Sequence, residues 1–488
     1  MAEPTGVVVP AVSESGRRST SALGRAVVAG ALTATDPAGA RAAQRETDWR
    51  RGYPVHFKRM VEVGFDDEAA AVRIARDGLA SLHDQMRYRD SADADAADVP
   101  LGEVFDNEVS DPLVTSLVEG RNQPEAEFSL PYKGERLRGD GVRRQLDAWV
   151  REGAMEPSAA DAVREVLDHP EWLALPGRTM VTLGATAEMG PLQALLRWGA
   201  TVAAVDLPQP EIWRRLVDLA RSSGGRLMVP THSEGLLVER AGADLLHDLP
   251  TVAEWVRGLR GPLVLGNYVY ADGEANLRVS TAVDALTAHV AGARDDLALA
   301  FLATPTDVYG VPAEAVTFSA QSYDSGRVAR LVRPAVRTIS GGRLLKRNYA
   351  PGSNPGLADS MVLQQGPNYI LAKRLQRWRA TAARRDGLEV SLNVAPPTRT
   401  RSVMKNRALA AAYAGAYRFG VDVFSPATSN TLMAALLVHD LNAGTGPLRD
   451  PWREEADKAV HGGLWRGPYE PRSALGIAVV LGMGRAKS

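Results

Sequence analysis

The stretch VTLGATAEMGPLQALLRWGATVAAVDLP, residues 181–208, decides the fold prediction. Its pattern predicts a strand, a glycine turn, a helix over about 191–198 and a second strand that ends at Asp206. Gly184 can make the tight turn, and Gly190 can let helix and strand pack closely. Because the N-terminus of such a helix attracts an anion, the unit predicts a site for the pyrophosphate of a dinucleotide.

Two carboxylates in this stretch have opposite implications. Asp206 can accept hydrogen bonds from a ribose diol and would repel a 2′-phosphate, which favours NAD over NADP. Arg214 and Arg215 lie near enough in sequence to keep NADP as the alternative. Glu188 stands where a glycine pattern would have its middle glycine, and its charge is unfavourable beside a pyrophosphate unless it turns away or binds a cation. The competing interpretation is an ordinary α/β turn with two glycines.

Six short apolar runs alternate with helical segments after about residue 178. They are RTMVTL (178–183), TVAAVDL (201–207), RLMVPT (226–231), GPLVLGN (261–267), LALAFLAT (297–304) and LEVSLNV (388–394). Runs of strand length separated by helices are typical of βαβ units and of a parallel sheet buried on both faces. The sequence therefore predicts an α/β fold, a Rossmann-like doubly wound parallel sheet with a mainly helical N-terminal extension.

The rest of the chain divides by composition. Residues 1–45 are rich in Ala, Gly, Ser, Thr and Pro, which predicts a disordered tail. We expect a helical N-terminal region over 46–175 and a catalytic domain over 176–488, with an insert at about 311–362. Apolar residues at helical spacing predict helices over 66–86, 139–153 and 156–172, the last capped by Ser158.

Composition argues against several classes of protein. The formal net charge of −1 offers no electrostatic footprint for nucleic acid, and no apolar stretch is long enough to span a bilayer. The absence of cysteine removes disulfides, thiolate nucleophiles and Cys-based zinc sites. The histidines lack paired spacing, and the acidic segment 90–111 suits a surface loop better than a calcium loop, so we expect no metal. We expect a cytoplasmic protein with a small-molecule substrate and no nucleic-acid or membrane partner.

A Tyr-Lys pair lies further along the chain, in GPNYILAKRLQRWRA (366–380). Tyr369 and Lys373 are four residues apart on a predicted helix, so their side chains share one face. A free tyrosine has a pKa of about 10, too high for an efficient base near neutrality. A neighbouring ammonium group stabilises the phenolate and lowers that pKa, so Tyr369 could exchange a proton with a hydroxyl or carbonyl group. The competing interpretation is a surface helix with an unremarkable tyrosine and lysine.

The order of these pieces resembles the short-chain dehydrogenase/reductase superfamily over about 178–445, and GIAVVLGM (476–483) would be its final strand. The matching residues are the glycine motif Gly184, Ala185, Thr186, Met189 and Gly190, the acidic Asp206, and the pair Tyr369 and Lys373. The resemblance also implies that cofactor contacts come from Asp244 and Leu245 in the adenine pocket, Asn267, Lys373, and Pro396 and Thr398 of a proline turn. It further implies an NAD cofactor, with NADP as the alternative, and a homodimer.

The resemblance does not decide which serine or threonine would polarise the carbonyl group of a substrate. The predicted fifth strand runs into the turn 305–310, which offers Thr304 and Thr306. Ser353 and Ser360, in the insert, are nearer to Tyr369 in sequence. We prefer Thr306.

These features together predict an NAD(P)-dependent oxidoreductase that transfers hydride between a nicotinamide cofactor and a hydroxyl or carbonyl group of a small organic substrate. One alternative is an epimerase or dehydratase with tightly bound NAD, suggested by the turn that begins at Asp307. The other is a dinucleotide-binding scaffold or sensor without catalysis, suggested by Glu188 and the displaced hydroxyl residue.

Overall fold

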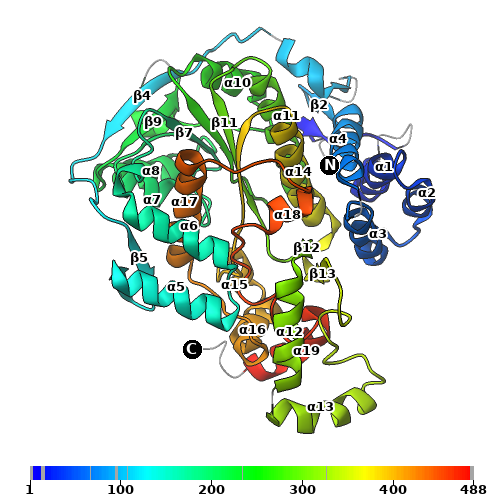
Figure 1. Ribbon diagram of the computed structural model, residues 1–488. Coiled ribbons are helices and arrows are strands. Elements are labelled where there is room, and N and C mark those ends of the chain that lie inside the picture. The colour runs from blue at the N-terminus through cyan, green and yellow to red at the C-terminus, as the bar shows by residue number, and fades with distance from the viewer. Residues whose placement is uncertain are drawn as a thin grey trace.

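A mostly parallel seven-stranded sheet is the centre of the molecule (Figure 1). The computed structural model describes residues 4–12, 17–65, 67–93, 97–106, 108–232, 235–325 and 327–483. The strands are β4 (Val114–Glu119), β7 (Thr179–Leu183), β8 (Thr201–Val205), β9 (Arg226–Thr231), β10 (Leu263–Asn267), β11 (Leu297–Ala303) and β14 (Glu389–Val394). Their order across the sheet is β14-β11-β10-β7-β8-β9-β4, and only β4 runs antiparallel to its neighbour.

This arrangement confirms the predicted α/β fold with a parallel sheet. All six predicted runs form strands, and numbered along the chain the parallel strands have the order 3-2-1-4-5-6. That order is consistent with a Rossmann-like fold. The order in which strands are added to the sheet reverses between the parallel strands β7 and β10, which is where ligands bind in open sheets of this kind.

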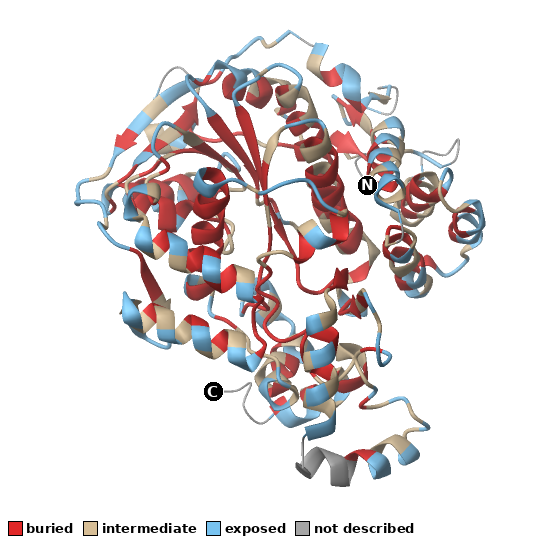
Figure 2. Cartoon of the chain, in the orientation of Figure 1, coloured by how far each residue is buried: buried red, intermediate tan, exposed pale blue. Residues whose placement is uncertain are grey.

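Helices cover both faces of the sheet, and the strands are buried between them (Figure 2). Val181 and Val205 pack with α10 (Leu249–Gly258), α11 (Gly273–Ala291) and α14 (Gly366–Arg385). Met180 and Val202 point to the other face, toward α6 (Pro157–Asp168), α7 (Leu192–Arg197), α8 (Pro210–Arg221) and α17 (Pro426–Ala443). Side chains that alternate along a strand therefore pack in two separate hydrophobic cores, one on each face of the sheet.

The expectation of a disordered tail over 1–45 is wrong for the residues described there. They form β1 (Gly6–Val8), α1 (Thr20–Leu32) and α2 (Pro37–Arg45). Ser19 caps α1, and Leu23 and Val27 of α1 are buried in the core that also holds α14. The small residues between them lower the apparent hydrophobicity, although the apolar side chains still recur at the four-residue spacing of a helix face.

Further helices extend this layer, and α4 matches the helix predicted over 66–86. They are α3 (Trp49–Val63) and α4 (Glu68–Gln85), followed by the short strands β2 (Arg87–Arg89) and β3 (Val99–Pro100). In Figure 1 these helices stand beside α14 and α11. They pack against the outer side of α14, since Gly78 of α4 lies directly against the Trp378 ring.

The boundary predicted near residue 175 does not separate two cores. β4 is the edge strand of the main sheet, and α5 (Asp140–Glu152) and α6 share a core with α8 and α17. The hairpin β5 (Ser129–Tyr132) and β6 (Glu135–Arg138) precedes them. Ser158 does not cap α6, because the cap residue is Glu156 and the Ser158 hydroxyl accepts the Lys458 backbone N–H at 3.0 Å instead.

The insert predicted at 311–362 is largely structured. It begins at the last residue of β12 (Val308–Val311) and holds α12 (Ala313–Ser325), α13 (Arg327–Ile339) and β13 (Gly356–Asp359), which pairs with β12. β12 and β13 share a third, smaller core with Trp465. The strand predicted over 476–483 is wrong, since this segment belongs to α19 (Pro471–Gly482) and packs on α16 (Arg407–Gly415). A short apolar run does not by itself distinguish a strand from a buried helix.

The remaining short helices are α9 (Leu237–Arg240), α15 (Arg401–Lys405) and α18 (Pro451–Ala456). Within the ranges that the structure describes, no helix has the length and apolar character needed to cross a membrane.

Candidate active site

A cleft of about 1160 Å³ opens at the carboxyl ends of the parallel strands. Of the predicted site residues it is lined by Gly184, Thr186, Met189, Asp206, Asp244, Leu245, Asn267, Thr306, Tyr369, Lys373, Pro396 and Thr398. Ala185 and Gly190 are buried behind its wall. Small-molecule sites usually enclose about 300–1,000 Å³, so the cleft has room for a large ligand.

The glycine turn is held close to the neighbouring strand. Gly184 has a φ of +81°, and a Cβ there would lie 2.9 Å from the Val269 Cα. Both the left-handed backbone and this close approach require a residue without a side chain. The backbone N–H groups of Gly184 and Ala185 donate to the Val205 carbonyl at 3.0 and 3.1 Å, which fixes the turn over β8.

Asp206 clamps this turn, a role that the sequence analysis missed. Its Oδ2 accepts both the backbone N–H and the hydroxyl of Thr186, each at 2.7 Å. Its Oδ1 accepts the Leu207 backbone N–H at 2.9 Å. Since a carboxylate has about four lone-pair sites, one acceptor site remains for a ribose hydroxyl.

Glu188 turns away from the glycine turn. Its carboxylate accepts the backbone N–H of Arg401 at 2.7 Å and the Arg401 side-chain Nε at 3.2 Å. It thereby neutralises part of its charge and caps the first turn of α15, which lies beyond the proline turn. The charge that made position 188 unfavourable for a pyrophosphate is therefore paired with a cation.

The loop of Asp244 forms another part of the cleft wall. The Asp244 carboxylate accepts the Leu246 backbone N–H at 2.9 Å and contacts His247 Nδ1 at 2.9 Å. The N-terminal strand β1 supports the loop from behind, since the Val7 backbone N–H donates to the Leu246 carbonyl at 2.9 Å. Asp244 is therefore a structural residue of this wall, and its position beside Leu245 leaves the apolar side chain to face the cleft.

Lys373 of α14 has no carboxylate partner among the residues that the structure describes. Its Nζ donates to the Leu302 carbonyl at 3.3 Å and to the Gln376 side chain at 3.2 Å, both neutral acceptors. Burial lowers the pKa of Lys373 to about 8. Gln376 in turn donates to the Asn267 side chain at 3.1 Å and so ties α14 to the end of β10. Gln376 was not predicted, although it follows Lys373 by one helical turn.

Tyr369 faces two hydroxyl groups at the end of β11. Burial raises the pKa of Tyr369 above its usual value, while hydrogen bonds with Thr304 and Thr306 act in the opposite direction. The two threonine hydroxyls lie 2.9 Å apart. The structure thus brings both predicted threonines to the tyrosine, whereas Ser353 and Ser360 do not line the cleft.

The proline turn completes the wall beside Tyr369. The Thr398 hydroxyl donates to the Pro396 carbonyl at 2.9 Å and lies 2.6 Å from the Ser429 hydroxyl of α17. These bonds fix the backbone of the turn, and the Thr398 side chain is almost fully buried.

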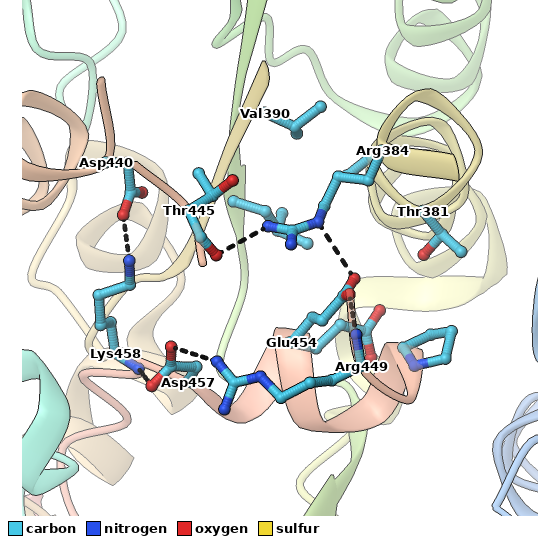
Figure 3. Close-up of a pocket in the computed structure, with 13 residues that line it drawn as sticks. Thr381, Arg384, Val390, Asp440, Thr445, Arg449, Glu454, Asp457 and Lys458 are labelled. Atoms are coloured by element: carbon cyan, nitrogen blue, oxygen red, sulfur yellow. Dashed lines mark hydrogen bonds and ion pairs between the residues drawn. The ribbon is translucent and has the colours of Figure 1, made fainter. Parts of the chain in front are cut away.

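A second cavity, of about 30 Å³, lies between α14, β14, α17 and α18 (Figure 3). Its charged side chains neutralise one another, as in the pairs Arg449–Asp457 at 3.2 Å and Arg384–Glu454 at 3.3 Å. This volume suits about one water molecule. No group of three or more potential metal ligands occurs among the residues that the structure describes.

Comparison with known proteins assigns no family to the chain. No family model and no curated protein matches it. Among solved structures, a thiolation-reductase di-domain from an archaeal non-ribosomal peptide synthetase is similar over 52% of this chain and 51% of that chain, with 12% sequence identity and a TM-score of 0.27. The chain thus spans about half the length of that structure.

Proposed function

We propose that the protein is an NAD(P)-dependent oxidoreductase of the short-chain dehydrogenase/reductase type. The observation that carries this proposal is that one cleft collects the glycine turn, Asp206, Tyr369, Lys373 and the threonine pair. These groups come from strands and helices up to about 190 residues apart in sequence. Perturbed titratable groups gathered in a large cleft are typical of an active site.

The residues of the cleft suit a nicotinamide dinucleotide. The turn at Gly184 lines the cleft, where its backbone would receive a pyrophosphate, and Asp206 retains an acceptor for a ribose hydroxyl. That acceptor favours NAD over NADP, because a carboxylate repels a 2′-phosphate. When bound, the cofactor would supply the hydride for reduction or accept it in oxidation.

The side chains near Tyr369 would handle the proton. In reduction of a carbonyl group, Thr304 or Thr306 donates a hydrogen bond to the carbonyl oxygen, and Tyr369 transfers its phenolic proton to the alkoxide that forms. Lys373, when charged, stabilises the phenolate that remains, which then regains a proton from solvent. The product is an alcohol.

Asp307 and Glu188 suggested the two alternative functions, and both pair with arginines in the structure. Asp307 is buried beside Arg374 and Arg377 and does not line the cleft, which removes its support for an epimerase or dehydratase. Glu188 is paired with Arg401, so its charge no longer argues for a non-catalytic scaffold. Simple oxidoreduction is therefore the function that the geometry favours.

Titration of the protein with NADH and NADPH, followed by nicotinamide fluorescence, tests the cofactor. We expect NADH to bind more tightly than NADPH and Asp206→Ala to weaken NADH at least tenfold. Thr186→Val serves as the control, because it removes one bond of the clamp and leaves the carboxylate in place. Equal losses in both variants would assign the effect to the turn rather than to the ribose. Binding of neither dinucleotide would refute the proposal.

A panel of carbonyl compounds then tests the reaction. We expect NADH-dependent reduction of at least one compound by the wild type and a loss of at least 100-fold in Tyr369→Phe, with dinucleotide binding retained. Product formation without net oxidation of the cofactor would favour an epimerase or dehydratase.

A further inference from the structure

A buried network of four charged side chains joins α14 to the turn after β11 and to α18. Asp307, with no exposed surface, accepts a hydrogen bond from Arg374 at 2.9 Å and another from Arg377 at 2.7 Å. Arg377 also forms a two-pronged pair with Glu455 of α18, at 2.6 and 2.5 Å. Two carboxylates thus face two guanidinium groups, and the charges of the network balance.

The network joins the two elements that carry the proposed chemistry. Asp307 follows Thr306 directly in the turn after β11, whereas both arginines belong to α14. The turn is tied a second time, because the Tyr309 hydroxyl donates to the Thr304 carbonyl at 2.5 Å and the Tyr309 ring lies 4.1 Å beneath the Arg377 guanidinium. Asp307 therefore sets where the threonines stand relative to Tyr369.

Three neighbouring cations of α14 differ in whether a carboxylate pairs with them. Lys373, Arg374 and Arg377 lie within five consecutive residues of α14. Both arginines are paired with carboxylates, whereas Lys373 contacts only the neutral Leu302 carbonyl and Gln376 side chain within the described structure. Lys373 is thus the cation of this group whose charge is left uncompensated toward the cleft.

We propose that Asp307 is a positioning residue of the active site: it holds the Thr304–Thr306 turn against α14 and neutralises the two arginines, so that their charges do not act on Tyr369. This proposal rests on the proposed function for its kinetic consequence. Its electrostatic consequence concerns the apoprotein and stands independently. The negative charge of Asp307 contributes to the raised pKa of Tyr369, and its removal leaves arginine charge that favours the phenolate.

Asp307→Asn tests the proposal against Asp284→Asn, a matched control. Asp284 of α11 is also buried and paired with an arginine of α14, Arg379, at 2.8 Å, but it touches neither threonine turn nor cleft. Each variant removes one buried carboxylate that pairs with an arginine of α14, so we expect similar losses of thermal stability. The ionisation of Tyr369 is followed by NMR of protein with ¹³C at the tyrosine ζ carbon, its resonance assigned by its absence in Tyr369→Phe.

We expect Asp307→Asn to lower the ionisation midpoint of Tyr369 and Asp284→Asn to leave it unchanged. With a substrate from the carbonyl panel, kcat should fall at least tenfold in Asp307→Asn, with dinucleotide affinity within twofold of the wild type, and stay within twofold in Asp284→Asn. An unmoved Tyr369 midpoint together with an unchanged kcat in Asp307→Asn, or equal effects in both variants, would overturn the proposal.

A double variant keeps the test open if Asp307→Asn fails to fold. Asp307→Asn with Arg374→Gln removes one charge of each sign, which is less costly than leaving an arginine unpaired. We expect it to recover stability and to return the Tyr369 midpoint toward that of the wild type. A double variant whose Tyr369 midpoint lies well below that of the wild type would contradict the charge argument. If the wild type binds neither dinucleotide, the proposed function fails, and the NMR comparison still decides the role of Asp307.

Discussion

At the scale of single residues, the buried ammonium group of Lys373 lowers the stability of the folded protein. Its ammonium group is buried among neutral acceptors, which lowers its pKa to about 8. In the unfolded chain the same group titrates near 10.5. Between these two pH values the unfolded chain binds a proton that the folded protein lacks, so stability rises with pH across this window.

Lys373→Met should therefore stabilise the protein at pH 7, by about 3 kcal/mol or less. The advantage should shrink as the pH rises from 8 toward 10.5, because the wild-type lysine becomes neutral in the folded state. Denaturant unfolding of both proteins at pH 7 and pH 9.5 measures the difference. A methionine variant that is no more stable than the wild type at pH 7 would contradict the burial argument.

Gly184 combines a left-handed backbone with a crowded position, and a second glycine separates the two effects. Gly177 has a similar φ of +77°, but a Cβ there would meet nothing within 4 Å. Gly177→Ala should cost about 1–2 kcal/mol through backbone strain and leave dinucleotide binding unchanged. Gly184→Ala should cost more and weaken dinucleotide binding at least tenfold, because its Cβ would push the turn away from Val269. Equal effects on binding would contradict this assignment.

At the scale of elements, Glu188 fastens α15 and the end of the proline turn to the glycine turn. Glu188→Gln weakens the pair with Arg401, so trypsin should cut after Arg401 or Lys405 faster than in the wild type, about threefold or more. Glu127→Gln is the control, since it breaks another exposed pair, with Arg138, and neither residue lines the cleft. Unchanged cleavage in Glu188→Gln would show that the segment is held without this contact.

Elements with a strong local signal were predictable, and those that depend on distant partners were not. All six parallel strands follow from runs of apolar residues, because a strand buried on both faces must be apolar throughout. Helix α1 was missed because Ala, Gly and Ser separate its few large apolar residues. The assignment of 476–483 was wrong because an eight-residue apolar run suits α19 equally well.

In the candidate site, too, residues with a local sequence pattern were predictable and contacts between distant residues were not. Residues of the candidate site with a recognisable pattern, such as Gly184 and the Tyr369–Lys373 pair, were selected from the sequence, and the structure places them in one cleft. The clamp from Asp206 to Thr186 and the bonds from Asp307 to α14 were not foreseen. Such contacts join side chains brought together only by the sheet, and nothing in local spacing reveals them.

At the scale of the whole molecule, α14 packs against the sheet on one side and against the N-terminal helices on the other. We therefore expect a single unfolding transition by calorimetry. Gly78→Val should lower its midpoint by several degrees without splitting it, because a Cβ at this position of α4 would lie within 3 Å of the Trp378 ring. Gly102→Val, at a position with open space, should change the midpoint little. Two separate transitions would show that the N-terminal helices form an independent unit.

The packing of α1 and α4 on α14 can form only after the ribosome has synthesised α14. About 280 residues separate the end of α4 from the start of α14, which a ribosome adds in roughly 15–60 s at 5–20 residues per second. During that time the surfaces of the first helices that pack on α14 lack this partner. The nascent chain therefore exposes apolar surface while it is still being made, and the yield of folded protein should depend on chaperones that shield growing chains.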